Sequence, residues 1–172
     1  MSWSVAAIDG MPADRAAGLL AECCGSARWV RAMVERRPFR RREALLSAAL
    51  EVWRSLDPAD WKEAFAHHPR IGERTSPLPQ GAQGRVWSAS EQAGVDSAGD
   101  QTRRALAEAN RAYEARFGYT YIVCATGRTA EEMLALARER LANDATSELR
   151  VAAGEQEEIA RLRLQAVLTP DP

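Results

Sequence analysis

The sequence is poor in the residues that build metal sites and disulfide frameworks. Its 172 residues include three cysteines and two histidines. The odd number of cysteines, the adjacency of Cys23 and Cys24, and the distance of Cys124 from both leave no Cys-x-x-Cys spacing. This pattern argues against a disulfide framework and against a zinc site. A reducing compartment is therefore expected.

Long apolar runs are also lacking. No stretch approaches the roughly 18 apolar residues that a membrane-spanning helix needs. The first ten residues, MSWSVAAIDG, have neither the basic start nor the apolar run of a secretory signal. We expect a cytoplasmic protein that does not associate with a membrane.

An excess of positive charge is missing as well. The formal net charge is −1, and Lys62 is the single lysine among the 23 basic residues. A broad basic surface for nucleic acid is therefore not predicted.

Apolar residues recur mostly at helical spacing, which predicts an all-α fold. The length fits a single domain over residues 1–172. Pro12, Ser26, the Asp57-Pro58 pair and Thr129 with Glu132 are typical helix starts. About eight helices are expected, over residues 12–24, 26–37, 41–56, 57–66, 88–94, 100–116, 129–142 and 146–168.

Two segments lack helical spacing. Thr75–Arg85 contains two prolines and two glycines and is predicted to be a loop. Tyr119–Ala125 is a short apolar run rich in aromatic and β-branched residues. Because no partner strand is evident, we expect it to be an extended, buried segment.

The two histidines are neighbours, His67 and His68, in the sequence AHHPRIGER. Histidine titrates near neutral pH and is the usual proton-transfer group, although a single histidine is more often structural. Pro69 disfavours helical geometry at His68, so the preceding helix should end there, beside an irregular loop. His68 is therefore the stronger catalytic candidate and His67 the weaker. Two adjacent histidines without a third ligand make a poor metal site.

Two other polar patterns have both a structural and a functional interpretation. Ser88, Glu91 and Gln92 form Ser-x-x-Glu-Gln, which is typical of a helix capping box but could equally place polar groups beside the loop. On the last helix, Arg163 lies four residues after Ile159 on the apolar face, whereas Arg161 points away. A buried arginine needs an acceptor, which could be an internal ion pair or a substrate carboxylate or urea-type carbonyl.

Four segments, in this order, resemble the 2-oxo-4-hydroxy-4-carboxy-5-ureidoimidazoline (OHCU) decarboxylase family. They are HPRIGER (68–74), SASEQ (88–92), RFGYTYIVCATGRTAEEML (116–134) and the tail ELR…EIARLRL (148–164). The resemblance implies an all-α homodimer without metal or organic cofactor. It also implies a small-molecule substrate, OHCU, which is converted to (S)-allantoin in urate breakdown.

The resemblance implies roles for particular residues. The catalytic histidine corresponds to His68 and its acidic partner to Glu91. The implied substrate-contacting set is Pro69, Ser88, Glu91, Gln92, the backbone of Tyr121, Ile122, Val123, Cys124 and Ala125, and Arg163. The Thr75–Arg85 loop is longer than expected for the family, which leaves the distance from His68 to Glu91 open.

Two alternatives belong to other classes of protein. The segment RREALLSAALEVW (41–53) resembles the first helix of a tetracycline-repressor-type regulator. The next segment, however, carries HPRIGER and a Pro/Gly loop instead of a basic recognition helix. A purely structural helical module is the other alternative, and the placement of both histidines within one tight motif argues against it.

Overall fold

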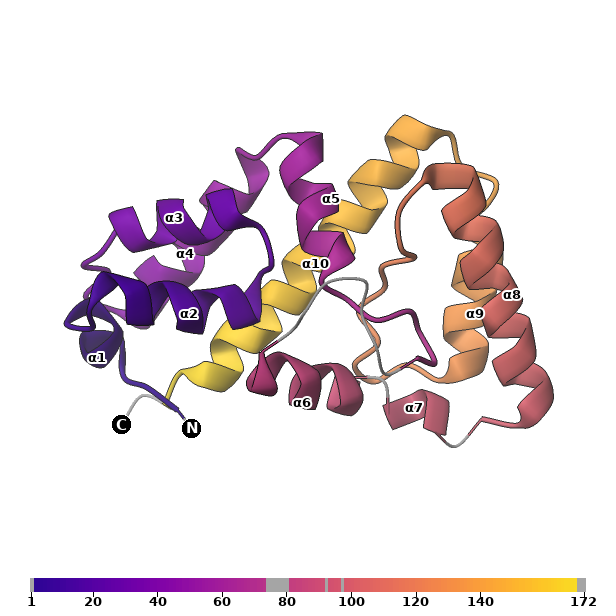
Figure 1. Cartoon of the computed structure of the whole chain (residues 1–172), viewed down its shortest axis with the longest axis horizontal. Helices are drawn as coiled ribbons and strands as arrows, with labels where there is room; N and C mark the ends of the chain where they lie inside the picture. Colours follow the sequence, from indigo (N-terminus) through magenta and orange to yellow (C-terminus); the bar gives the residue numbers. More distant parts are fainter. Residues whose placement is uncertain (1, 74–80, 92, 97, 170–172) are drawn as a thin grey trace. The chain divides into compact units, whose positions relative to one another are not determined.

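The computed structural model describes residues 2–73, 81–91, 93–96 and 98–169. These residues form helices without a β-strand, apart from an isolated bridge between Trp3 and Leu168 (Figure 1). The all-α prediction is confirmed. The helices are α1 (Val5–Asp9), α2 (Ala13–Cys23), α3 (Ala27–Glu35), α4 (Arg42–Arg54), α5 (Pro58–Ala66), α6 (Ala82–Glu91), α7 (Ala93–Asp96), α8 (Asp100–Phe117), α9 (Ala130–Arg140) and α10 (Ala145–Val167).

Helices α3 and α9 begin directly after the polar capping residues that the sequence predicts for them. The Ser26 hydroxyl accepts a hydrogen bond from the Trp29 N–H at the start of α3. At the start of α9, Thr129 and Glu132 form both bonds of a capping box. Each cap satisfies backbone donors that have no partner inside the helix. Local side chains therefore decide where these two helices begin.

The prediction was wrong around Ser88. Helix α6 begins at Ala82, so Ser88 lies inside the helix and does not cap it. Gly94 does not end a helix but lies within α7. The predicted loop is helical from Ala82 to Arg85, and its residues 75–80 lie outside the described part of the chain. With the unpredicted α1, these changes give ten helices among the described residues in place of about eight.

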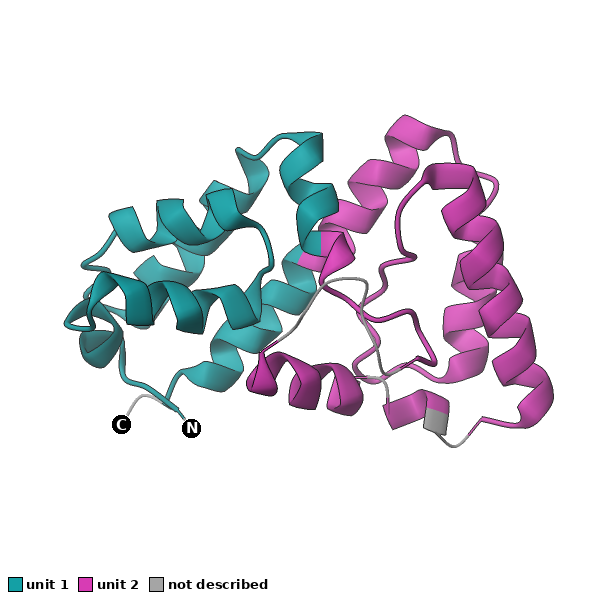
Figure 2. Ribbon diagram, in the orientation of Figure 1, with its two compact units in different colours: residues 1–64, 157–172 teal, residues 65–156 magenta. Residues whose placement is uncertain are grey.

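The chain divides into two compact units, residues 1–64 with 157–172 and residues 65–156 (Figure 2). Unit 1 holds α1–α4, most of α5 and the end of α10. Its core contains the side chains of Leu20, Trp29, Leu45 and Leu164. The Trp29 indole N–H also donates to the Ala49 carbonyl at 3.0 Å, so this large buried ring keeps its polar atom satisfied.

Unit 2 is built on the packing of α8 against α9. One buried apolar cluster joins these helices to the loop after α5, to α7 and to residues 121–125. Its buried members are Ile71, Val95, Ala98, Leu106, Ala109, Tyr113, Tyr121, Val123, Ala125, Ala130, Met133, Leu134 and Ala137. The first part of α10, up to Gln156, also belongs to this unit. None of the helices among the described residues is long and apolar enough to cross a membrane.

Candidate active site

His68 lies just beyond the C-terminal end of α5. The helix ends at Ala66, and the backbone N–H of His68 donates to the Phe65 carbonyl at 3.0 Å. The His68 residue is 7% exposed and Pro69 is also buried, whereas His67 is half-buried. The predicted helix end before Pro69 is confirmed, and of the two imidazoles His68 is the better shielded from solvent.

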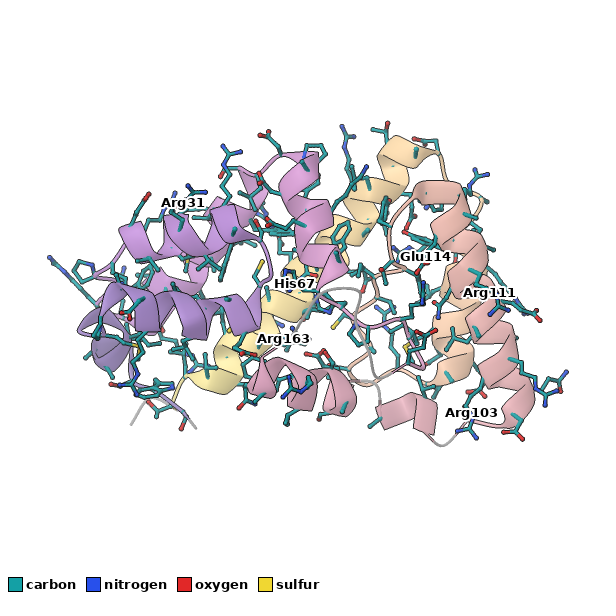
Figure 3. The ribbon with its side chains drawn as sticks, viewed as in Figure 1. Arg31, His67, Arg103, Arg111, Glu114 and Arg163 are labelled. Carbon is teal, nitrogen blue, oxygen red and sulfur yellow. The ribbon has the colours of Figure 1, made fainter. Side chains whose placement is uncertain are left out.

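The loop that follows His68 is bound to α8 by two side chains. The Arg70 guanidinium donates to both carboxylate oxygens of Glu114, at 2.6 and 2.9 Å. The Asn110 amide donates to the Ile71 carbonyl at 2.9 Å. Figure 3 labels Glu114 on α8. Hydrogen bonding to Glu114 raises the pKa of Arg70, so the Arg70 guanidinium stays charged in this two-point contact. No local sequence pattern predicts this contact, because residues 70 and 114 are 44 positions apart.

The described part of the Ser-x-x-Glu-Gln motif, residues 88–91, lies at the C-terminal end of α6. Ser88 is buried within α6, and Glu91 is the half-buried last residue of that helix. Gln92 lies outside the described residues. Ser88 and Glu91 therefore belong to the last part of α6, and Glu91 precedes Gly94 by three positions in the sequence.

Gly94 packs directly on the turn after the 121–125 segment. A Cβ atom at this position would overlap the backbone carbonyl of Arg128. The Arg128 N–H in turn donates to the Ala125 carbonyl at 3.0 Å. Absence of a side chain at position 94 thus allows α7 to approach this turn closely.

We expect Gly94→Ala to lower the free energy of unfolding by about 1–3 kcal/mol, because backbone must move to relieve the overlap. Gly154→Ala in α10 is the matched control, since nothing lies within 4 Å of its added Cβ. That substitution should stabilise by roughly 0.5–1 kcal/mol through helix propensity. Denaturant unfolding of both variants measures the difference. Equal stability of Gly94→Ala and the wild type would contradict the close packing.

Residues 121–125 are all buried, as the sequence predicts for an extended apolar segment. Three of their backbone groups are already bonded within the protein. The Ile122 carbonyl accepts from Arg140 at 2.8 Å, and the Cys124 N–H donates to Glu155 at 2.7 Å. The third is the Ala125 carbonyl in the turn to Arg128.

Arg140 belongs to a buried polar network beneath this segment. Its guanidinium donates to Glu148 at 2.6 and 2.8 Å, and Asn143 donates to the other oxygen of that carboxylate at 2.8 Å. The Tyr113 hydroxyl also donates to Glu148. Arg140 lies 4.9 Å from the Tyr121 ring centre, and burial raises the pKa of Tyr121 to about 12. The positive charge of Arg140 is balanced by the negative charge of Glu148 inside this network, as a buried charge requires.

The apolar cluster of unit 2 brings three of the predicted motifs together. Ile71 follows the His68-Pro69 pair, Val95 follows the Ser-x-x-Glu-Gln motif, and Tyr121 begins the extended segment. In addition, a Cβ placed on Gly72 would lie 3.8 Å from the Val95 side chain. Segments from three distant parts of the sequence therefore surround a common core.

Arg163 lies in unit 1, on the C-terminal part of α10 (Figure 3). It is 5% exposed and donates to the Glu22 carbonyl at 3.4 Å. Arg161 is exposed and pairs with Glu158 at 2.6 Å. The predicted inward direction of Arg163 and outward direction of Arg161 are confirmed.

The thiols of Cys23 and Cys24 are buried in the same unit. Burial raises the pKa of Cys24 to about 12, against an opposing effect of its hydrogen bond with Ser26 and of the positive charge of Arg163. The pKa of Cys23 is also raised by burial. Both groups are therefore neutral thiols near neutral pH.

Within the described ranges, no group of three or more histidine, cysteine, aspartate or glutamate side chains is arranged to hold a metal ion. All three cysteines are buried and none is in a disulfide. The polar side chains near the motifs instead bind backbone groups and one another.

The chain matches a known enzyme family over most of its length. Residues 9–165 match the model of the OHCU decarboxylase family. This chain belongs to the OHCU decarboxylase family. The match includes the segment 41–53 that also resembles a regulator helix, so that segment is accounted for by the decarboxylase fold.

This OHCU decarboxylase family member is similar to known proteins in sequence and in fold. The Arabidopsis thaliana "Uric acid degradation bifunctional protein TTL" is 35% identical over 143 residues, which are 83% of this chain and 44% of that protein. The OHCU decarboxylase of Amia calva is 32% identical over 135 residues, 77% of this chain and 75% of that one. A crystal structure of OHCU decarboxylase in the presence of (S)-allantoin has 31% identity and a TM-score of 0.77, covering 89% of this chain and 99% of the other. The chain thus spans less than half the length of the Arabidopsis protein.

Proposed function

We propose that this protein decarboxylates OHCU to (S)-allantoin in urate breakdown. The family match over residues 9–165 carries this proposal. The relative solved in the presence of (S)-allantoin supports the product. The burial of His68 at the end of α5, on a loop fixed to α8, supports a residue held ready for proton transfer.

The chemistry of OHCU needs little beyond orientation and proton transfer. The carbon that loses CO2 bears a hydroxyl group and lies next to a C=N bond. The electron pair left by CO2 moves into this imine, whose nitrogen takes up a proton. The resulting enol is then protonated on the ureido-bearing carbon and loses its hydroxyl proton, giving the ring carbonyl of allantoin. The protein must therefore align the carboxylate, stabilise the delocalised charge and deliver the proton to one face.

His68 is assigned the proton transfer and Glu91 the orientation of its imidazole. Arg163 is assigned two-point binding of a substrate carboxylate or urea-type carbonyl, which suits the planar guanidinium. These roles follow the family motif. The remaining proposed contacts are Pro69, Ser88, Gln92 and the backbone of Tyr121, Ile122, Val123, Cys124 and Ala125.

The direct test adds the protein to urate, urate oxidase and hydroxyisourate hydrolase and follows optical activity. OHCU also decays without an enzyme, and that decay gives a racemate. Faster decay of OHCU together with the rotation of one enantiomer is the expected result. Racemic product at the uncatalysed rate would refute the proposed activity.

We expect full activity after exhaustive dialysis against a chelator. The imine of the substrate itself accepts the electrons released with CO2, so the reaction needs no metal or organic cofactor as an electron sink. The measurement compares kcat/KM before and after dialysis, with and without added Zn²⁺. A rate that falls on dialysis and returns with Zn²⁺ would contradict this expectation.

We also propose that the protein is a cytoplasmic homodimer. The family resemblance supports the dimer, and the three buried thiols fit a reducing compartment. Light scattering on the purified protein measures the dimer directly. A mass corresponding to one 18.9 kDa chain at micromolar concentration would argue against it.

A further inference from the structure

The backbone of the segment 121–125 has two distinct edges. The side chains of Tyr121, Val123 and Ala125 belong to the apolar cluster of unit 2, whereas Ile122 and Cys124 are not among its members. This alternation is that of an extended chain. In an extended chain the N–H and C=O of one residue point to one edge, and those of the next residue point to the other. The polar backbone groups of Ile122 and Cys124 therefore share one edge.

Two side chains from different helices hold that edge. Arg140 of α9 donates to the Ile122 carbonyl at 2.8 Å, and Glu155 of α10 accepts from the Cys124 N–H at 2.7 Å. On the first of these helices, the Tyr121 hydroxyl also donates to the Met133 carbonyl at 3.0 Å. Helices α9 and α10 thus hold the segment at two backbone atoms and one side chain. The backbone groups of Tyr121 and Val123 are directed to the opposite edge.

We propose that Glu155 is a positioning residue for substrate binding. It holds the Cys124 N–H, while Arg140 holds the Ile122 carbonyl, so that the opposite edge of the segment is presented to the substrate in one fixed orientation. This inference rests on the proposed function, in which the backbone of residues 121–125 contacts OHCU, and it narrows that contact to the backbone groups of Tyr121 and Val123.

The geometry distinguishes this role from that of a simple ion pair. Glu155 lies 2.7 Å from the Cys124 nitrogen but 3.7 Å from the Arg128 guanidinium. Its side chain is 21% exposed, so the longer contact to Arg128 is weakened by solvent. We therefore expect KM for OHCU to depend more on the Glu155 oxygen that accepts from the Cys124 N–H than on the negative charge of Glu155.

Two conservative substitutions separate the acceptor from the charge. Glu155→Gln keeps the length and an acceptor oxygen but removes the charge. Glu155→Asp keeps the charge but withdraws the carboxylate by one carbon. We expect Glu155→Asp to raise KM for OHCU about tenfold with little change in kcat, because only substrate binding is disturbed. Glu155→Gln should stay close to the wild-type KM.

Glu157→Gln and Glu157→Asp are the matched controls. Glu157 lies on the same helix, is 25% exposed and pairs with Arg54 in unit 1. Both control variants should keep the wild-type KM, and melting temperatures of all four show that they are folded. A Glu155→Gln variant that is impaired more than Glu155→Asp would assign the effect to the ion pair and overturn the proposal. Unchanged KM in Glu155→Asp would also overturn it.

The same measurements separate this inference from the proposed function. Turnover of OHCU by the wild type, with an unaffected Glu155→Asp, would refute only the positioning role of Glu155. Failure of the wild type to turn over OHCU would instead refute the proposed function, and the positioning role with it.

Discussion

Replacing His68 with asparagine is expected to lower kcat/KM for OHCU by about two to four powers of ten. This is roughly the contribution of a positioned proton-transfer group to catalysis. Asparagine has a polar side chain of similar size, but it cannot exchange a proton near neutral pH. The loop around it should persist, because Arg70 and Asn110 bind it to α8 independently of the imidazole.

His67→Asn is the matched control for this experiment. His67 is the adjacent residue and carries the same imidazole, but it is half-buried where His68 is 7% exposed. We expect it to keep most of the activity. The coupled rotation assay gives kcat/KM for both variants, and circular dichroism gives their melting temperatures. Equal losses in two folded variants would show that the imidazoles had been assigned in the wrong order.

Arg163→Lys is expected to lower kcat/KM about ten- to a hundredfold. Loss of charge-assisted bonds to a substrate costs about 1.5–3 kcal/mol, and lysine cannot reproduce the two-point contact of a guanidinium. Arg163 is 5% exposed, so its charge is little screened by solvent. The melting temperature is measured in parallel, because Arg163 also donates to the Glu22 carbonyl at 3.4 Å within unit 1.

Arg161→Lys serves as the control on the same helix. Its side chain is 44% exposed and pairs with Glu158, and exposed pairs of this kind contribute little. We expect near-normal kcat/KM and an unchanged melting temperature for this variant. If Arg163→Lys melts early yet turns over normally when folded, Arg163 is a core residue and not a substrate ligand.

The sequence alone predicted most of the helices correctly, because their ends are marked locally. Ser26 and Thr129 cap backbone donors in the first turn of α3 and of α9. Pro69 disfavours helical backbone at the residue before it, and α5 ends at Ala66. A capping residue acts over three or four positions, so its effect can be read from its neighbours. The same holds for the inward face of α10 at Arg163, which follows from helical spacing.

The prediction around α6 was wrong because packing overrode local preference. Gly84 would weaken an isolated helix, and Ser88 followed by Glu91 is a typical helix start. In the structure both Gly84 and Ser88 are buried inside α6. Burial of a helix face contributes more than the propensity of a single residue, so the helix begins before the predicted cap.

The all-α class, the family and the candidate residues of the site could thus be inferred from the sequence. The three-dimensional packing settled which partners hold the segments around those residues: Glu114 for Arg70, the Arg128 turn for Gly94, and Glu155 for the Cys124 N–H. The last two pairs are 34 and 31 positions apart, counted from residues 94 to 128 and from 124 to 155. Helical periodicity tells which face of an element is buried, but not which distant element covers it. With 23 basic and 24 acidic residues, many pairings are possible, and the packing of apolar side chains selects among them.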